Sequence, residues 1–536
     1  MMSTPLTLSH LLDRAARLFG RIEIVSQTPQ KSLLRHCYAD VQRRARALSQ
    51  ALLAAGLARG DRVATLMWNH HVHLEAYFGI PAAGGVIHTL NLRLHPDDLT
   101  YIASHAEDRF LIVDDVLLPI LESFAGRVDF ERVIVATHSG DAVPSGMQRY
   151  EAFLESATDS ARLPDIAEYE AAGLCYTSGT TGRPKGVVYS HRALVLHSFA
   201  CGLADMMGLC QRDVALPVVP MFHVNAWGLP YTATLVGCKQ VLPGPHLDPV
   251  SLLDLCERER VTLSAGVPTV WLGLLRELDA APDRWKLAPG LRLLVGGSAA
   301  PPSMIRGFDR HGLHVMHLWG MTETTPLGTA STLKSYLEDL PEEEQLAVRA
   351  TQGLPAPFVE ARAMGEQGEA AWDGKTLGEL QVRGPWIADG YFKVPESDRW
   401  TDDGWFCTGD VVSIDPEGYV KIADRTKDLI KSGGEWISSV ELENALMGHA
   451  SVREAAVIAI PDPRWQERPL AVVVLEEGAQ VTADELRAFL ADRFAKWWIP
   501  DAFEFVDSIP RTATNKFLKS ALRAQFASRG GSERDA

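Results

Sequence analysis

The sequence has few cysteines, and none of them forms a CxxC pair. Its seven cysteines are scattered over 536 residues and their number is odd, which is typical of reduced thiols in a cytoplasm-like compartment. The N-terminus also lacks the compact apolar run of a secretory signal, because Asp13, Arg14 and Arg17 interrupt it early. We therefore expect a cytoplasmic protein.

Positive charge is scarce as well. The chain has 52 Lys and Arg residues against 68 Asp and Glu, and its formal net charge is −16. This balance argues against nonspecific nucleic-acid binding, which needs a basic surface, but it is compatible with a local cationic pocket for an anionic substrate. The hydrophobic share of 46% and charged share of 22% exclude a mostly disordered chain. The length exceeds what one hydrophobic core usually supports, so at least two domains are expected.

One long stretch lacks charge altogether. Val214 to Cys238 contains no Asp, Glu, Lys or Arg, and its length of about 25 residues would span a bilayer. Three prolines interrupt it, and His223 and Asn225 lie inside it, which a membrane helix would tolerate poorly. The pattern favours buried strand and loop at a binding pocket, and no transmembrane segment is predicted.

Helical and strand patterns alternate through the first 300 residues. Val41–Ala55 and Asp97–Ala106 have helical spacing, and Val63–Met67 and Phe110–Val113 have the composition of strands. Such alternation predicts mainly parallel, doubly wound sheets covered by helices, and hence an α/β fold. The chain shows no internal repeat and no low-complexity linker.

The last hundred residues have a different pattern, that of a small α+β unit. Ala455–Ile460 and Leu470–Leu475 are predicted strands. Thr482 and Glu485 form a capping box before a predicted helix at 486–494, and a second box at 438–441 opens a helix near residue 440. The strongly charged segment 424–428 suits a boundary, so we predict an N-terminal domain of residues 1–426 and a C-terminal domain of residues 427–536.

The segment Tyr176–Gly186, YTSGTTGRPKG, has the composition of a phosphate-binding loop. Three glycines, four Ser or Thr residues and two cations lie within it. Glycines let successive backbone amides form an anion-binding concavity, while hydroxyls donate to phosphate oxygens and cations neutralise them. The spacing differs from that of a Walker A loop. A flexible surface loop is the alternative that composition alone leaves open. The predicted phosphate-binding residues are Thr177, Ser178, Gly179, Thr180, Thr181, Gly182 and Lys185.

This loop and six further segments resemble the adenylate-forming enzymes: acyl-CoA synthetases, peptide-synthetase adenylation domains and firefly luciferase. The segments follow in order over nearly the full length and are PMFHVNAWG at 220–228, GGSAAP at 296–301, WGMTET at 319–324, TGD at 408–410, DRTKDLIKSGGEW at 424–436 and PRTATNK at 510–516. Two segments, PMFHVNAWGLPY and IKSGGEWISSVELENALMGH, are most similar in sequence to the corresponding segments of bacterial medium- or long-chain fatty-acid–CoA ligases. Methylmercaptopropionate ligases have similar sequences in these two segments.

The resemblance implies a fold and a reaction. The fold is a large N-terminal domain with two doubly wound sheets and a small barrel-like part, followed by a mobile C-terminal domain. The reaction joins a fatty acid to coenzyme A through an acyl-adenylate, consuming ATP with Mg²⁺ and releasing AMP and pyrophosphate. Because an anion attacks a polyanion, the site must supply positive charge and aimed donors.

Residue roles are carried over from the matching motifs. Lys516 is the expected catalytic lysine, Thr322 the contact to the α-phosphate, and Glu323 the Mg²⁺ ligand. Asn515 stands where the family usually has Gly before this lysine, and Asn tolerates left-handed backbone better than most residues. His223, grouped with the catalytic residues, and Trp227 are expected beside the acyl group.

The nucleotide and coenzyme A contacts are expected in four further motifs. Trp319 replaces the family's usual Tyr, so an aromatic face for adenine is kept and a hydroxyl is lost. The remaining expected adenosine contacts are Gly297, Ser298, Ala299, Gly320, Asp410 and Arg425, with the last two on the ribose. Lys427 matches the hinge about which the C-terminal domain rotates. After rotation, the segment with Lys431, Gly433, Gly434 and Glu435 would face the active site and approach coenzyme A.

Several alternatives stay open at this point. The acid could be short, such as 3-methylmercaptopropionate, or the acyl group could pass to a carrier protein. A luciferase-like oxygenase and a non-catalytic nucleotide-binding protein are further alternatives, and Asn515 is the feature that invites the latter. Family likeness suggests a homodimer, and peripheral membrane contact is left open, while no nucleic-acid partner is expected.

Overall fold

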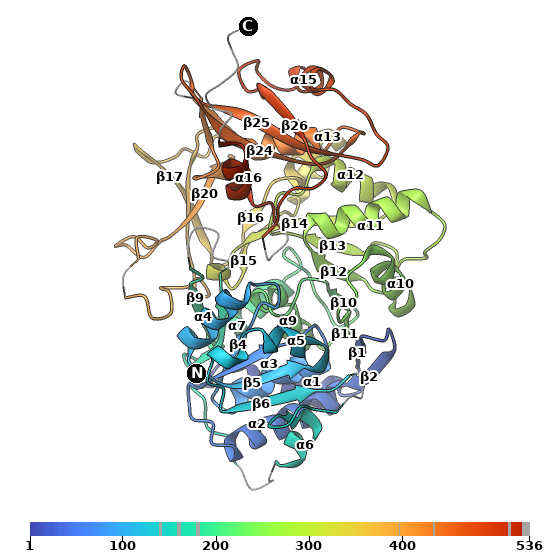
Figure 1. Ribbon diagram of the computed structural model, residues 1–536, viewed down its shortest axis with the longest axis vertical. Coiled ribbons are helices and arrows are strands. Elements are labelled where there is room, and N and C mark those ends of the chain that lie inside the picture. Colours follow the sequence, from blue (N-terminus) through green and yellow to red (C-terminus); the bar gives the residue numbers. More distant parts are fainter. Residues whose placement is uncertain are drawn as a thin grey trace.

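The computed structural model describes residues 1–138, 142–157, 162–177, 183–395, 397–432, 435–512 and 516–527, without the side chain of Glu435. Four sheets are formed by these residues. Figure 1 shows the N-terminal sheet containing β5 and β6 at one end of the long axis and the C-terminal sheet containing β24 and β25 at the other. The predicted fold class, α/β with a large N-terminal part and a small C-terminal one, is confirmed.

The N-terminal sheet has seven strands in the order β7-β6-β5-β3-β4-β8-β9. All neighbours are parallel except β8 and β9. The predicted strands at 63–67 and 110–113 correspond to β3 and β5. The strands are β3 (Arg62–Leu66), β4 (Val86–Thr89), β5 (Asp108–Asp114), β6 (Arg132–Ala136), β7 (Gln148–Arg149), β8 (Ala171–Tyr176) and β9 (Gly186–Ser190).

A second sheet has nine strands in the order β16-β15-β14-β13-β12-β10-β11-β1-β2. Its central strands are parallel, and the antiparallel strands lie towards its two edges. The strands are β1 (Glu23–Gln27), β2 (Leu33–Cys37), β10 (Val214–Pro217), β11 (Lys239–Leu242), β12 (Leu263–Gly266), β13 (Arg292–Val295), β14 (His314–Gly320), β15 (Leu327–Ala330) and β16 (Leu354–Pro355).

Helices cover both sheets. The helix α3 (His71–Ala82) is buried along almost its whole length because it contacts strands of both sheets. The predicted helices at 41–55 and 97–106 are α2 (Tyr38–Ala54) and α4 (Pro96–Ala106). The other helices of this part are α1 (Leu8–Phe19), α5 (Leu118–Glu122), α6 (Tyr150–Glu155), α7 (His191–Gly202), α8 (Val224–Trp227), α9 (Leu229–Val236), α10 (Pro249–Glu259), α11 (Pro268–Ala280), α12 (Pro302–Arg310) and α13 (Glu342–Arg349).

A smaller sheet of five antiparallel strands follows, in the order β18-β17-β19-β20-β21. This sheet corresponds to the small barrel-like part that the family resemblance implied. It positions the predicted ribose contacts, since Asp410 on β20 pairs directly with Arg425 on β21. Its strands are β17 (Glu360–Gly365), β18 (Gly368–Glu369), β19 (Gly378–Arg383), β20 (Phe406–Ile414) and β21 (Val420–Arg425).

The C-terminal sheet contains the two strands predicted at 455–460 and 470–475, which lie within β24 and β25. The capping box of Thr482 and Glu485 is present, but its helix α15 ends at Ala491, three residues before the predicted end. At the second box, Ser438 accepts from the Glu441 N–H, whereas the Glu441 carboxylate pairs with Lys421. The elements are β22 (Ile430–Ser432), β23 (Glu435–Ile437), α14 (Ser439–Leu446), β24 (Val452–Asp462), β25 (Gln466–Leu475), α15 (Ala483–Ala491), β26 (Ala502–Phe505) and α16 (Lys519–Gln525).

Two sequence predictions concern segments between these elements. The uncharged stretch 214–238 is a buried strand and loop as expected in its first half, but its second half is the helix α9, which the proline-rich pattern concealed. Across the described residues, no helix combines the length and apolar composition needed to cross a membrane. The division at residues 426 and 427 stays a prediction.

Candidate active site

A cavity of about 690 Å³ is lined by residues from the nine-stranded sheet, the five-stranded sheet and the C-terminal segment. Its volume is within the usual range for a small-molecule site. The predicted residues among its lining are Thr177, Lys185, His223, Trp227, Gly297, Ser298, Ala299, Trp319, Gly320, Thr322, Glu323, Asp410, Arg425, Lys427 and Lys516. Residues up to 339 positions apart in the chain, Thr177 and Lys516, thus share one cavity.

Lys516 extends into this cavity and lies over Gly297. A Cβ atom built on Gly297 would be 3.4 Å from the Lys516 Cε and 4.0 Å from its Nζ, and the Gly297 φ of +82° favours glycine. Burial, together with repulsion from Arg425, lowers the pKa of Lys516 to about 8. Among the described residues, no carboxylate forms an ion pair with its ammonium group. The site therefore holds a cation that a negatively charged ligand could stabilise.

Asp410 is the centre of a buried charged group. Its Oδ2 accepts a hydrogen bond of 2.8 Å from the Trp319 indole N–H, and its Oδ1 is 2.7 Å from Nε of Arg425. Trp319 is the last residue but one of β14, and its ring lies against Gly328, where a Cβ would not fit. The indole thus supplies a hydrogen-bond donor to Asp410 in addition to the aromatic face that the sequence predicts.

Glu323 is held beside the cavity by a side chain that the sequence did not single out. The segment Thr322–Thr324 is a short 3₁₀ helix, and the Tyr391 hydroxyl donates to Glu323 Oε1 at 2.6 Å. The ammonium of Lys185 lies 4.7 Å from the centre of the Tyr391 ring, a cation–π distance. Tyr391 lies outside every motif used in the sequence comparison, so only its contacts identify it.

His223 and Trp227 flank an unusual turn. Val224, Asn225, Ala226 and Trp227 all have φ between +44° and +57°, a left-handed conformation that costs about 1–2 kcal/mol per non-glycine residue. Strain of this kind is often found at functional sites. Burial and repulsion from Lys516 lower the pKa of His223 to about 3, so its imidazole is neutral at neutral pH.

Comparison with protein families and curated proteins decides the classification. Residues 12–392 match the family described as AMP-binding enzyme, and residues 441–516 match the AMP-binding enzyme C-terminal domain. The chain belongs to the AMP-binding enzyme family. This confirms the resemblance to adenylate-forming enzymes that the motifs indicated.

Two curated relatives of this AMP-binding enzyme are similar over almost their whole length. A long-chain-fatty-acid–CoA ligase of Thermus thermophilus is 54% identical over 98% of this chain and 96% of the relative. A 3-methylmercaptopropionyl-CoA ligase of Ruegeria pomeroyi is 46% identical over 98% of both chains.

Solved structures are also similar to this chain. ATP-bound MatB from Rhodopseudomonas palustris is 27% identical, with a TM-score of 0.81 over 98% of this chain and all of that one. An anthranilate CoA ligase with anthranoyl-AMP, 24% identical, has a TM-score of 0.87 over 98% of both chains, which supports the fold alone.

Not every predicted residue of the AMP-binding enzyme lies in the described cavity. Ser178, Gly179, Thr180, Thr181, Gly182, Gly433 and Gly434 lie outside the described residues, as do Asn515 and the Glu435 side chain. At the base of the phosphate loop, the Thr177 N–H donates to the Lys185 carbonyl and the Lys185 N–H donates to Thr177 Oγ1. Lys431 is exposed on β22 and is not part of the cavity lining. The roles assigned to all these residues stay predictions.

Proposed function

We propose that this AMP-binding enzyme is an ATP-dependent ligase that joins a medium- or long-chain fatty acid to coenzyme A through an acyl-adenylate. The observation that carries the proposal is Lys516, whose ammonium group lies in the cavity next to Gly297 without an ion-pair partner among the described residues. The similarity to curated ligases of the long-chain and medium-chain kind supports the choice of reaction and acid.

The cavity has groups that suit each part of ATP. Ser298 and Ala299 line the wall beside Gly297, where small residues let a flat base approach the backbone. Asp410 keeps acceptor capacity for ribose hydroxyls, because each carboxylate oxygen has two lone pairs and only one is used by Trp319 or Arg425.

The same cavity suits Mg²⁺ at Glu323. A single carboxylate is apt for this ion, which keeps several waters and shares phosphate oxygens, and Tyr391 orients the carboxylate. When bound with ATP, Mg²⁺ neutralises phosphate charge. Thr322, beside Glu323, is the proposed donor to the α-phosphate.

In the first half-reaction, an oxygen of the acid attacks the α-phosphorus of ATP, and the bond to pyrophosphate breaks. The Lys516 ammonium would donate to the attacking carboxylate and to an α-phosphate oxygen, reducing their repulsion. His223 stays neutral and therefore does not compete for the carboxylate as a second cation. Coenzyme A thiol then attacks the acyl carbon, giving the thioester and AMP; the segment from Lys431 to Glu435 is proposed to face the site for this step after rotation about Lys427.

The cavity lining also contains apolar side chains that suit an acyl chain. They include Met207, Val224, Trp227, Leu272 and Leu327. Burial of a methylene is worth about 0.8 kcal/mol, or roughly fourfold in kcat/KM. We expect kcat/KM to rise with each added methylene and to level off where the apolar wall ends. We also propose a cytoplasmic location.

A panel of carboxylic acids tests the proposal, with AMP release measured in the presence and absence of coenzyme A. Preference for fatty acids and dependence of thioester formation on free coenzyme A are the expected results. Flat or falling values from acetate upward would favour a short acid such as 3-methylmercaptopropionate, the substrate that the name of the Ruegeria relative indicates. AMP release without consumption of free coenzyme A would indicate transfer to a carrier protein. Failure of every acid to drive pyrophosphate exchange would reject an adenylating enzyme.

A further inference from the structure

Three side chains converge outside the AMP-binding cavity, at the carboxyl ends of three neighbouring parallel strands. His70 follows β3, Asp114 is the last residue of β5, and His138 follows β6. The strands lie in the order β6-β5-β3 and are parallel, so their carboxyl ends share one edge of the sheet. In open α/β sheets this edge is where ligands bind. No residue of this group lines the AMP-binding cavity.

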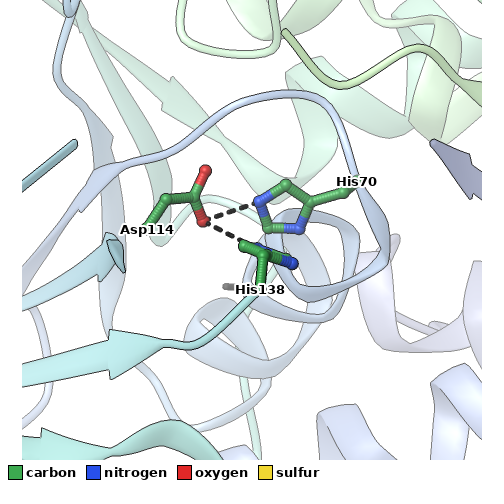
Figure 2. A group of neighbouring side chains, drawn as sticks. All are labelled: His70, Asp114 and His138. Atoms are coloured by element: carbon green, nitrogen blue, oxygen red, sulfur yellow. Dashed lines mark hydrogen bonds and ion pairs between the residues drawn. The ribbon is translucent and has the colours of Figure 1, made fainter. Parts of the chain in front are cut away.

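The group has donor atoms close enough to share one ion. His70 Nε2 lies 2.7 Å from Asp114 Oδ1, and His138 Nε2 lies 3.3 Å from the same oxygen. Figure 2 shows the two imidazoles converging on this carboxylate. One nitrogen or oxygen from each residue lies within 4.8 Å of the others. All three side chains are at most 7% exposed. Ligand atoms about 2 Å from one tetrahedral ion lie roughly 3.3 Å apart, as His138 Nε2 and Asp114 Oδ1 do, and the His70–Asp114 hydrogen bond would have to open by about 0.6 Å to admit the ion.

The carboxylate is held in position by the backbone. The Trp68 N–H donates to Asp114 Oδ2 at 2.8 Å, which leaves Oδ1 facing the two imidazoles. The His138 N–H donates to Asp115 Oδ2 at 2.7 Å, which fixes the start of the loop after β6. Such supporting hydrogen bonds commonly orient metal ligands.

A small cavity and two unpartnered atoms lie at the same place. The cavity, of about 10 Å³, is lined by Gln27, His70, His71, Asp114 and His138 among others, and accommodates one water-sized species. His70 Nδ1 and Gln27 Oε1 are buried without a hydrogen-bond partner in the described structure. The exposed surface of this cavity is mostly apolar, but buried polar atoms nearly always have partners, so the two orphaned atoms point to a small bound species.

We propose that His70, Asp114 and His138 bind one divalent transition-metal ion of the Zn²⁺ type, with a water molecule completing its coordination. Two imidazole nitrogens and one carboxylate oxygen suit Zn²⁺, whereas Mg²⁺ and Ca²⁺ prefer oxygen ligands alone. The ion would tie together the loops after β3, β5 and β6.

The first of these loops also supports the segment that leads to His223. Asn69, next to His70, donates through Nδ2 to the carbonyls of Pro217 and Val219, and its Oδ1 accepts from the Met221 N–H. The metal would therefore have a structural role, because it would fix the loop whose Asn69 holds the segment before His223.

Zn²⁺ binding to the whole, tag-free enzyme tests the proposal. The protein is stripped with a chelator, dialysed, and titrated with Zn²⁺ in excess Mg²⁺, with Co²⁺ as a spectroscopic probe. The expected results are about one ion per chain, a higher melting temperature and visible Co²⁺ absorption that Zn²⁺ abolishes. Substoichiometric binding with no change in melting temperature would overturn the proposal without any variant.

Variants then locate the ion. Asp114→Asn and His138→Gln should weaken Zn²⁺ binding by at least about tenfold, since even residues that only support metal ligands commonly contribute 10–100-fold. The matched control is His95→Gln, because His95 is also close to a carboxylate, Asp97, but is 71% exposed and does not belong to the group. Circular dichroism identifies variants that remain folded. Unchanged Zn²⁺ affinity in a folded Asp114→Asn or His138→Gln protein would place the ion elsewhere and overturn the assignment.

Discussion

Lys516 and Lys519 lie three residues apart in the C-terminal segment, yet their surroundings are opposite. The ammonium of Lys519 is 2.7 Å from Glu443 Oε1 and donates to Ser439 Oγ at 2.6 Å. Burial alone would lower the pKa of Lys519, but the carboxylates of Glu443, Asp424 and Asp428 outweigh it, so that pKa is raised. The pKa of Lys516 is lowered to about 8, because burial and Arg425 outweigh its more distant carboxylates.

The difference separates a structural cation from one available to a ligand. Lys519 is neutralised by the protein, and its removal would leave the buried Glu443 carboxylate without a counter-charge. Both lysines line the cavity of about 690 Å³, but Lys516 has no ion pair among the described residues, so a polyanion there would supply its missing counter-charge. Electrostatic environment, rather than burial, distinguishes the two residues.

The largest effect expected from this comparison is on stability. Lys519→Met should lower the free energy of unfolding by about 3–5 kcal/mol, because Glu443 would remain buried without its partner. Urea denaturation monitored by circular dichroism measures this change. The matched control is Lys421→Met: Lys421 also pairs with a carboxylate, Glu441, but is 55% exposed, so about 1 kcal/mol or less is expected. Equal losses in the two variants would contradict a special role for the buried pair.

Lys516→Ala should have the complementary effect. We expect adenylation to fall by about 10²–10³-fold, the usual loss when one donor to developing charge is removed. Thioester formation from supplied acyl-adenylate should survive, and the melting temperature should not fall, because no ion pair of the described structure is broken. Pyrophosphate exchange, a coupled thioester assay and thermal denaturation measure the three quantities. Equal loss of both half-reactions would contradict the assignment of Lys516 to adenylation.

How far the sequence alone predicts these features depends on whether they are local. The helices at 41–55 and 97–106 follow from periodicity, and the presence of Lys516 in the cavity agrees with the family motif that singled it out. The left-handed turn at 224–227 contains no glycine, so the local sequence does not predict its backbone conformation. Its conformation depends on the packing around it.

Contacts between distant segments were not predictable for a related reason. The hydrogen bond from Tyr391 to Glu323 joins residues 68 positions apart, and that from Trp319 to Asp410 joins residues 91 positions apart. The strand order β6-β5-β3 brings His70, Asp114 and His138 together. In a sheet with its strands in sequence order, β4 would lie between β3 and β5 and would separate His70 from Asp114. Periodicity identifies strands but does not determine their order in a sheet.

An intermediate effect is expected at the indole that donates to Asp410. Trp319→Phe keeps an aromatic face but removes the donor, so we expect kcat/KM for ATP to fall about tenfold, in line with the loss of a hydrogen bond to a charged group. Trp319→Tyr restores a hydroxyl and serves as the control; it should recover part of the loss if donation matters. Wild-type kinetics in Trp319→Phe would show that the aromatic face alone suffices.

The smallest effect, and the most direct comparison of the two lysines, is the pH dependence of adenylation. Lys516 with a pKa of about 8 is protonated below that pH and neutral above it, so kcat/KM for ATP should fall as the pH rises through about 8.

The free energy of unfolding should change with pH in the opposite direction to activity. Between pH 8 and the ordinary pKa of 10.5, the unfolded chain retains a proton that native Lys516 has lost, so the contribution of this residue to stability rises with pH. Pyrophosphate exchange measured from pH 6 to 9.5 should show the decline in the wild type, while the residual activity of Lys516→Ala should lack it. A decline at the same pH in both proteins would assign the titration to another group, and the distinction between Lys516 and Lys519 would then rest on structure alone.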